Sequence, residues 1–160
     1  MPLSPEKLCL RLTEEGENTV AFFSELPESV LNAQIYTEGD HWSIGHVIRH
    51  IVQAEKSIQR LMASILGGSA GTPEDFDLDA YNERKVREIE AVVLADLLAD
   101  FAATRARTIA WVSGRTPADL AQTGRHPFLG IAPIEEMVKL LYRHTRLHQR
   151  DIRRSLNGGD

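Results

Sequence analysis

The chain has 160 residues, of which 42% are hydrophobic and 26% charged, so it can bury one substantial core but has little material for two. Its formal net charge of −5 excludes a broad basic surface of the kind that dominant nucleic-acid binding requires. No segment approaches the roughly 20 apolar residues of a membrane-spanning helix, and the single cysteine, Cys9, cannot form an internal disulfide. We therefore expect one cytoplasmic domain over residues 1–160, with neither a nucleic-acid nor a membrane partner.

The first two predicted elements are helices with apolar residues at helical spacing. Ser4 and Pro5 form a typical helix start, and the first pattern continues to about Leu26. A second helix is predicted from near Ser43 to a glycine-rich segment that begins at Gly67. Its inner stripe carries Glu55 among the apolar residues Ile44, Val47, Ile48, Ile51, Ile58, Met62 and Ile65.

A third helical region is predicted from about Leu78 to Trp111, either as one helix or as two that are separated near Glu90. Residues 123–130 are expected to form an irregular connection. The last helix is predicted to begin at Pro133, whose missing N–H is tolerated in a first turn. Four amphipathic helices favour an all-α, up-down four-helix bundle.

Histidines are the residues that point to chemistry. His144 and His148 lie one turn apart near the inner stripe of the last helix, where two imidazoles can bind one metal ion. His46 and His50 have the same spacing on the second helix, and His50 lies nearer its apolar stripe. Buried histidines that are hydrogen-bonded to backbone or carboxylate groups are the alternative interpretation. His41 and His126, in predicted connections, are interpreted as ordinary polar residues.

Three segments resemble the DinB/YfiT-like proteins, a superfamily of metal-binding four-helix bundles, and the resemblance extends over nearly the whole chain. They are residues 42–51, residues 79–84, and the segment from His126 to Gly130 that leads into the His144 and His148 pair. The resemblance implies a metal triad of His50, His144 and His148. It also implies a divalent ion, most often zinc or nickel with iron, manganese or cobalt as alternatives, and a homodimer. Characterised relatives include transferases and isomerases that use low-molecular-weight thiols.

Three histidine ligands leave coordination positions open, as catalytic sites require. The resulting hypothesis is a metal-dependent hydrolase or thiol-dependent transferase. It would act on a small-molecule substrate, either alone or together with a low-molecular-weight thiol. Glu55, one turn from His50, is the candidate general acid or base, with His46 as the weaker candidate. Glu55 could instead orient a ligand histidine or form a salt bridge with an arginine.

The alternative is a non-catalytic bundle, stabilised by metal, that acts as a stress-related binding or interaction protein. A polar-walled pocket over the metal would favour catalysis, whereas a fourth protein ligand such as His46 would favour the structural role. Five arginines on the last helix could form an anion-binding surface, although a solvated helix face explains them as well. They are Arg143, Arg146, Arg150, Arg153 and Arg154.

Overall fold

Four long helices form a bundle in the computed structural model, which describes residues 3–35, 42–87 and 93–158. These helices are α1 (Pro5–Ser24), α2 (Ile44–Leu66), α4 (Leu94–Ser113) and α6 (Ile134–Leu156). Both α1 and α2 pack against α4 and α6, so the four helices enclose one interior. The all-α bundle expected from the sequence is confirmed. None of the described helices is both long enough and apolar enough to cross a membrane.

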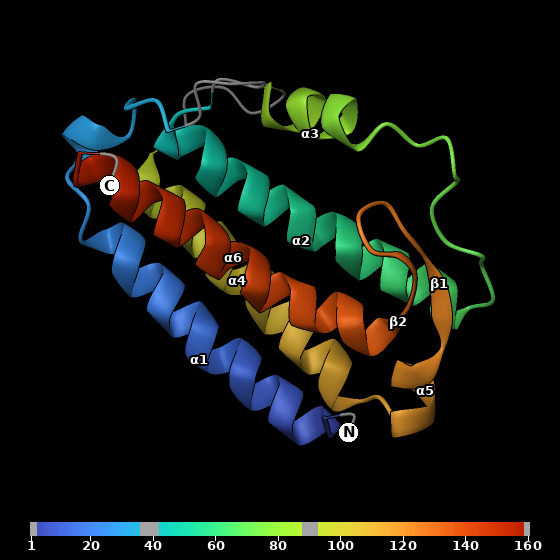
Figure 1. Cartoon of the computed structure of the whole chain (residues 1–160). Helices are drawn as coiled ribbons and strands as arrows, with labels where there is room; N and C mark the ends of the chain where they lie inside the picture. Colours follow the sequence, from blue (N-terminus) through green and yellow to red (C-terminus); the bar gives the residue numbers. More distant parts are fainter. Residues whose placement is uncertain (1–2, 36–41, 88–92, 159–160) are drawn as a thin grey trace.

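The connection between α2 and α4 sets the direction of the helices. It contains α3 (Leu78–Arg87), which packs against α2. Because this connection returns the chain to the end of the bundle where α2 begins, α2 and α4 run in the same direction, and so do α1 and α6 (Figure 1). Of the four long helices, α2 and α4 follow one another and run in the same direction, whereas an up-down order would require their directions to alternate. Glu90 lies outside the described residues, and the helices on either side of it are separate.

Two short helices complete the helical part of the described chain. The 3-10 helix η1 (Glu28–Val30) follows α1, and α5 (Pro117–Ala121) follows α4. Thr116 caps α5, because its side chain accepts a hydrogen bond from the backbone N–H of Asp119. The last helix begins at Ile134, and Pro133 occupies the capping position directly before it.

The prediction of an irregular connection over residues 123–130 is wrong, because this segment belongs to a β-hairpin. Strand β1 (Thr123–His126) pairs antiparallel with β2 (Gly130–Pro133) around a three-residue turn. Gly130, the first residue of β2, has φ +72°, a left-handed conformation that glycine adopts without steric cost directly after the turn. The hairpin is attached to the chain after α2, since the backbone N–H of Thr72 donates to the carbonyl of Arg125.

The attachment depends on a glycine, and we expect Gly71→Ala to lower the free energy of unfolding by about 2–4 kcal/mol. Gly71 has φ +98°, and a Cβ there would lie 2.5 Å from the backbone N and O of Arg125. Gly68→Ala is the matched control, because Gly68 has φ +105° with nothing near its Cβ position. Gly68→Ala should lower the free energy of unfolding by only about 1–2 kcal/mol. Equal losses in urea denaturation would show that the contact with Arg125 is not tight.

A buried polar layer divides the core. One apolar cluster lies toward the start of α2 and includes Phe23 and Phe101, whereas the other lies toward its end and includes Met62 and Met137. Each of the four long helices contributes buried polar side chains between the two clusters. They are Glu15, Thr19, His50, Glu55, Thr104, Arg105, Thr108, Thr145, His148 and Gln149. The polar layer therefore crosses the bundle at its middle, and it includes His50 and His148.

Candidate metal centre

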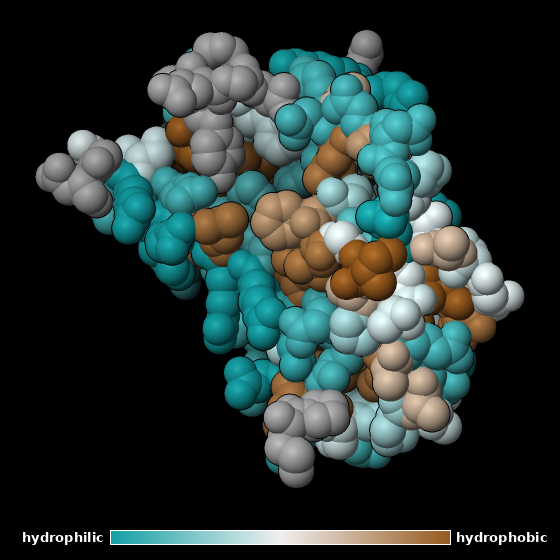
Figure 2. Space-filling model, turned by 45° about the vertical axis from the view of Figure 1, so that its right-hand side comes forward, coloured by the Kyte–Doolittle hydropathy of each residue, from teal (hydrophilic) through white to brown (hydrophobic). Residues whose placement is uncertain are grey.

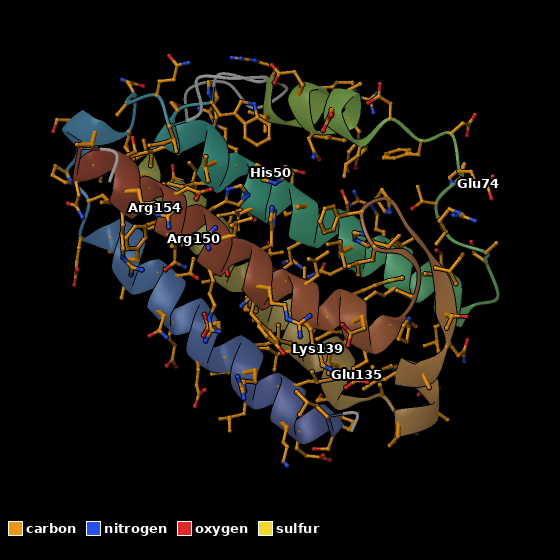
Figure 3. All side chains as sticks on the ribbon, in the orientation of Figure 1. His50, Glu74, Glu135, Lys139, Arg150 and Arg154 are labelled. Carbon is orange, nitrogen blue, oxygen red and sulfur yellow. The ribbon has the colours of Figure 1, made fainter. Side chains whose placement is uncertain are left out.

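Three histidines from two helices come together within this layer. His50 projects from α2 toward α6 (Figure 3), and its Nε2 lies 2.9 Å from Nε2 of His144. Nε2 of His148 lies 2.8 Å from the same atom of His144. His144 and His148 meet because residues four apart on a helix share one face. The structure thus brings together the three residues that the sequence nominated as metal ligands.

Trp42 covers the His50 side of the cluster. Its ring centroid lies 4.8 Å from that of His50, and its Nε1 donates a 2.9 Å hydrogen bond to Oε2 of Glu83 on α3. This bond fixes the indole and contributes to the lowered pKa of the Glu83 carboxyl group. Trp42 is buried, so it shields His50 from water at this side.

The electrostatic environment keeps the three rings neutral. Burial, assisted by the neighbouring His144, lowers the pKa of His50 to about 3. Burial and the adjacent His148 lower the pKa of His144 to about 3, and burial with His50 does the same for His148. Neutral imidazole is the form that binds metal. The three ligand nitrogens lie within 4.8 Å of one another, so they could hold one ion about 2.0–2.1 Å from each.

The three histidines open onto a cavity of about 860 Å³. Its walls come from α2, the segment after α2, α3, the hairpin turn and α6. Asp79 and Asn82 of α3 contribute to the wall. A small organic molecule could therefore reach the ring nitrogens, which a closed structural metal site would not allow.

His126 is the cavity residue that the sequence analysis missed. Its Nδ1 accepts the backbone N–H groups of Phe128 at 3.0 Å and Leu129 at 3.2 Å. The ring proton of the neutral form is therefore on Nε2. Burial lowers the pKa of His126 to about 4, which favours this neutral form. Pro127 and Gly130 were the available signal, because proline and glycine three residues apart are typical of a tight turn after His126.

Glu55 is not part of this cavity wall. Its two carboxylate oxygens accept hydrogen bonds from Arg105 of α4, with Nε to Oε1 at 2.8 Å and Nη2 to Oε2 at 3.1 Å. The hydroxyl of Thr108 also donates to Oε1. Of the alternatives considered for Glu55, the structure shows the salt bridge with an arginine.

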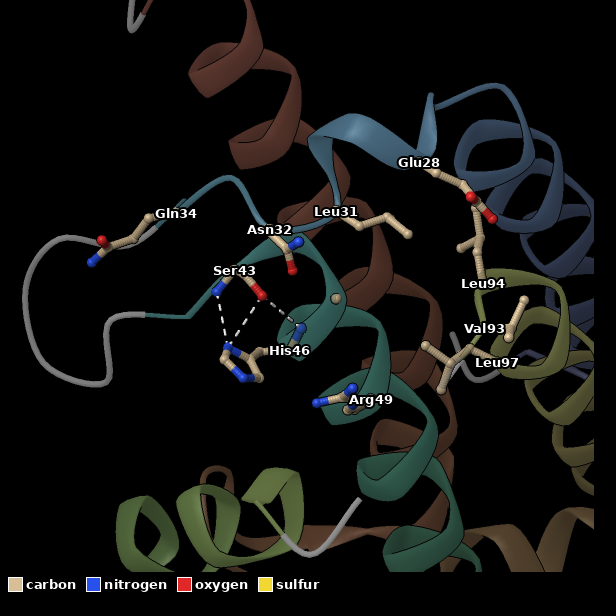
Figure 4. Close-up of a pocket in the computed structure, with 11 residues that line it drawn as sticks. Glu28, Leu31, Asn32, Gln34, Ser43, His46, Arg49, Val93, Leu94 and Leu97 are labelled. Carbon is tan, nitrogen blue, oxygen red and sulfur yellow. Dashed lines mark hydrogen bonds between the residues drawn. The ribbon is translucent and has the colours of Figure 1, made fainter. Parts of the chain in front are cut away.

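His46 lies at the start of α2, apart from the three-histidine cluster. Its Nδ1 accepts from the backbone N–H of Ser43, while Ser43 Oγ accepts from the backbone N–H of His46, as Figure 4 shows. These reciprocal bonds cap the helix. His46 borders a separate cavity of about 640 Å³, and its Nε2 lies 3.3 Å from Arg87. The residue considered as a fourth metal ligand is therefore engaged elsewhere.

The arginines of α6 are mostly occupied by nearby groups. Arg143 pairs with Glu136, Arg146 pairs with Glu15, and Arg153 lies 4.7 Å above the ring of Phe22. A solvated helix face with local ion pairs explains these residues, as the sequence analysis allowed. His41, the remaining histidine, lies outside the described residues.

Comparison with known proteins identifies relatives of the chain. A family model described as the DinB superfamily matches residues 11–152. No curated protein gives a match. Among solved structures, YfiT from Bacillus subtilis superposes with a TM-score of 0.73 at 19% identity, covering 92% of this chain and 83% of that one. Its description is a probable metal-dependent hydrolase with an unusual four-helix bundle topology.

Two further structures show the same fold. A mycothiol-dependent maleylpyruvate isomerase superposes with a TM-score of 0.75 at 14% identity, and the match covers 93% of this chain but only 60% of that one. TT2238, described as a four-helix bundle protein, gives a TM-score of 0.60 at 17% identity, with 94% and 98% of the two chains covered. At these identities the likeness extends to the fold alone.

Proposed function

The chain belongs to the DinB superfamily, and from this premise we propose that it is a metal-dependent enzyme acting on a small organic molecule. His50, His144 and His148 would hold one divalent ion, with zinc or nickel as the metals we expect. The observation that carries the proposal is that the three clustered Nε2 atoms belong to residues that line an 860 Å³ cavity. A site with three protein ligands and an adjoining cavity has the composition of a catalytic centre.

The reaction class we propose is hydrolysis or transfer of a low-molecular-weight thiol. YfiT is described as a probable metal-dependent hydrolase, and the isomerase is described as mycothiol-dependent. These descriptions support the two classes without deciding between them. The homodimer that the family resemblance implies is part of the proposal, and light scattering would test it.

A divalent ion, when bound, would lower the pKa of water or of a thiol and so supply a nucleophile near neutral pH. The chain's own residues prepare the site for this chemistry. The histidines are held neutral, so protons do not compete for their ring nitrogens near pH 7. Trp42 keeps water away from one side of His50. The wall around the histidines is largely apolar, and not polar as the sequence led us to expect of a catalytic pocket. An apolar wall still suits catalysis, because it excludes water and so strengthens the electrostatic interactions within the site.

Metal content and activity test the proposal together. Purified chain without a tag, stripped by a chelator and reloaded, should contain about one zinc or nickel ion per chain. His148→Ala should lose the ion, whereas His46→Gln should retain it, since glutamine preserves the helix cap. Nickel binding should also quench Trp42 fluorescence, because that indole packs against His50.

The loaded protein should then hydrolyse esters or amides, or join a small thiol to an electrophile, and chelation should abolish the turnover. Wild-type protein that binds no metal would overturn the proposed site. Bound metal with a fourth protein ligand, seen by X-ray absorption, together with no turnover would instead establish the non-catalytic bundle.

A further inference from the structure

The cavity beside the three histidines has apolar walls along most of its length. Side chains from α2, the segment before α3, the hairpin turn and α6 form these walls, among them Ile58, Leu61, Phe76, Phe128, Leu140 and Leu147. Three of them also reach the surface, since Phe128 is 73% exposed, Leu147 44% and Phe76 37%. Figure 2 shows apolar residues gathered near the middle of one face of the molecule. A contiguous apolar surface of this kind indicates a ligand-binding groove.

Few charges line the same cavity. Apart from histidines, the described wall contains Arg60, Asp79 and Arg143 as its charged residues. Arg143 pairs with Glu136, and Arg60 donates to the hydroxyl of Ser57. Asp79 contributes a negative charge to the same wall. The wall therefore lacks the concentrated positive charge that a ligand with several carboxylates would need.

One polar group in the wall, Nε2 of His126, has no hydrogen-bond partner among the residues that the structure describes. This nitrogen is buried. Because Nδ1 accepts two backbone N–H groups, Nε2 carries the proton and must act as a donor. The same tautomer prevents Nε2 from binding a metal ion. A buried donor without a partner is costly, so an acceptor atom of a bound molecule is the group that would satisfy it.

We propose that the cavity binds an organic molecule with an oxygen-containing head and an extended apolar body of the acyl or alkylaryl class. The head lies at the three histidines, where Nε2 of His126 donates a hydrogen bond to it. The body lies along the apolar walls past Leu61 and Leu147. This proposal rests on the metal centre of the proposed function and specifies the substrate class of that site.

A series of alkyl hydroxamates tests both the head and the apolar body of the proposed ligand. The hydroxamate head binds zinc, and the alkyl chain contacts the apolar walls. Isothermal titration of the zinc-loaded protein would compare acetohydroxamate with its butyro-, hexano- and octano- homologues. We expect the affinity to rise about fourfold for each added methylene until the cavity is filled. Adipic monohydroxamate, which ends in a carboxylate, should bind more weakly than hexanohydroxamate.

The wall is tested by a matched pair on α6. Leu147→Ala should weaken octanohydroxamate binding by about fivefold and leave acetohydroxamate unchanged. Leu156→Ala is the control, since Leu156 is 41% exposed on the same helix but lies outside the cavity wall. Neither compound should bind this control differently from the wild type.

The variant His126→Asn tests Nε2 of His126 as a donor. The asparagine side-chain oxygen can replace Nδ1 as the acceptor of the backbone N–H groups in the turn, so the variant removes only the Nε2 donor. All four hydroxamates should bind this variant about five- to tenfold more weakly, with the same gain per methylene and the same zinc content. In the wild type, ¹⁵N spectra should show His126 protonated at Nε2, and that N–H signal should shift when acetohydroxamate binds. A purely structural role in the turn would leave the signal unmoved.

The outcomes separate this inference from the proposed function. Protein that takes up no zinc would overturn the metal centre and this proposal with it. Zinc-loaded protein that binds acetohydroxamate without any gain from longer chains would overturn the apolar-body assignment alone. Loss of zinc from His126→Asn would show that His126 is a ligand and would overturn its assignment as the donor.

Discussion

Replacement of Glu55 by alanine is expected to lower the free energy of unfolding by about 3–5 kcal/mol. The guanidinium of Arg105 is buried, and it would lose both oxygens that accept its Nε and Nη2 bonds. The hydroxyl of Thr108 would lose an acceptor at the same time. The remaining bond from Arg105 to the carbonyl of Leu12 cannot compensate a buried charge. Urea denaturation followed by circular dichroism would measure the loss.

Two controls make this result interpretable. Lys56→Ala removes one partner of the salt bridge with Asp100, which is more exposed than the pair of Glu55 and Arg105. This variant should lower the free energy of unfolding by no more than about 1 kcal/mol. The double variant Glu55→Leu with Arg105→Met should recover much of the loss, because it removes the stranded charge. Zinc content should be unchanged in every case. A Glu55→Ala protein of normal stability that had lost its turnover would instead support the catalytic role first considered for Glu55.

Acidification from pH 7 to pH 5 is expected to destabilise the metal-free protein by several kcal/mol. The pKa values of His50, His144 and His148 are about 3 in the folded chain, compared with about 6.5 for histidine in an unfolded one. Below pH 6.5 the unfolded chain therefore binds protons that the folded chain does not, so its free energy falls relative to the folded state. Between pH 7 and pH 5 each ring lowers the free energy of unfolding by on the order of 2 kcal/mol. The loss continues as the pH falls toward 3.

Denaturation curves at several pH values would measure this effect in chelator-treated protein. A variant with glutamine at all three positions should show a flatter dependence between pH 7 and pH 5. His126, whose pKa is lowered to about 4, would leave a residual slope. Zinc at about 1,000 times its dissociation constant should raise the stability at pH 7 by about 4 kcal/mol. A metal-free wild type with constant stability over this range would show that the folded rings accept protons freely.

Local patterns in the sequence predicted the long helices of the bundle and the position of His144 beside His148, although they did not reveal the short helix α5. The spacing of Ile44, Val47 and Ile51 fixes which face of α2 is buried, and the same rule applies to α6. One helical turn places His144 beside His148 whatever the rest of the fold does. The phase of His50 relative to its apolar stripe favoured it over His46, and the two rings indeed lie in different places.

Only the tertiary structure decided the contacts between distant segments. Whether Glu55 faces the histidines or Arg105 depends on the packing of α2 against α4, which the periodicity of neither helix contains. His126 reaches the cavity because the hairpin pairs with the chain at Gly71, a contact across more than fifty residues. A local pattern records which face of an element is buried, but the partner on that face is set by how the elements assemble.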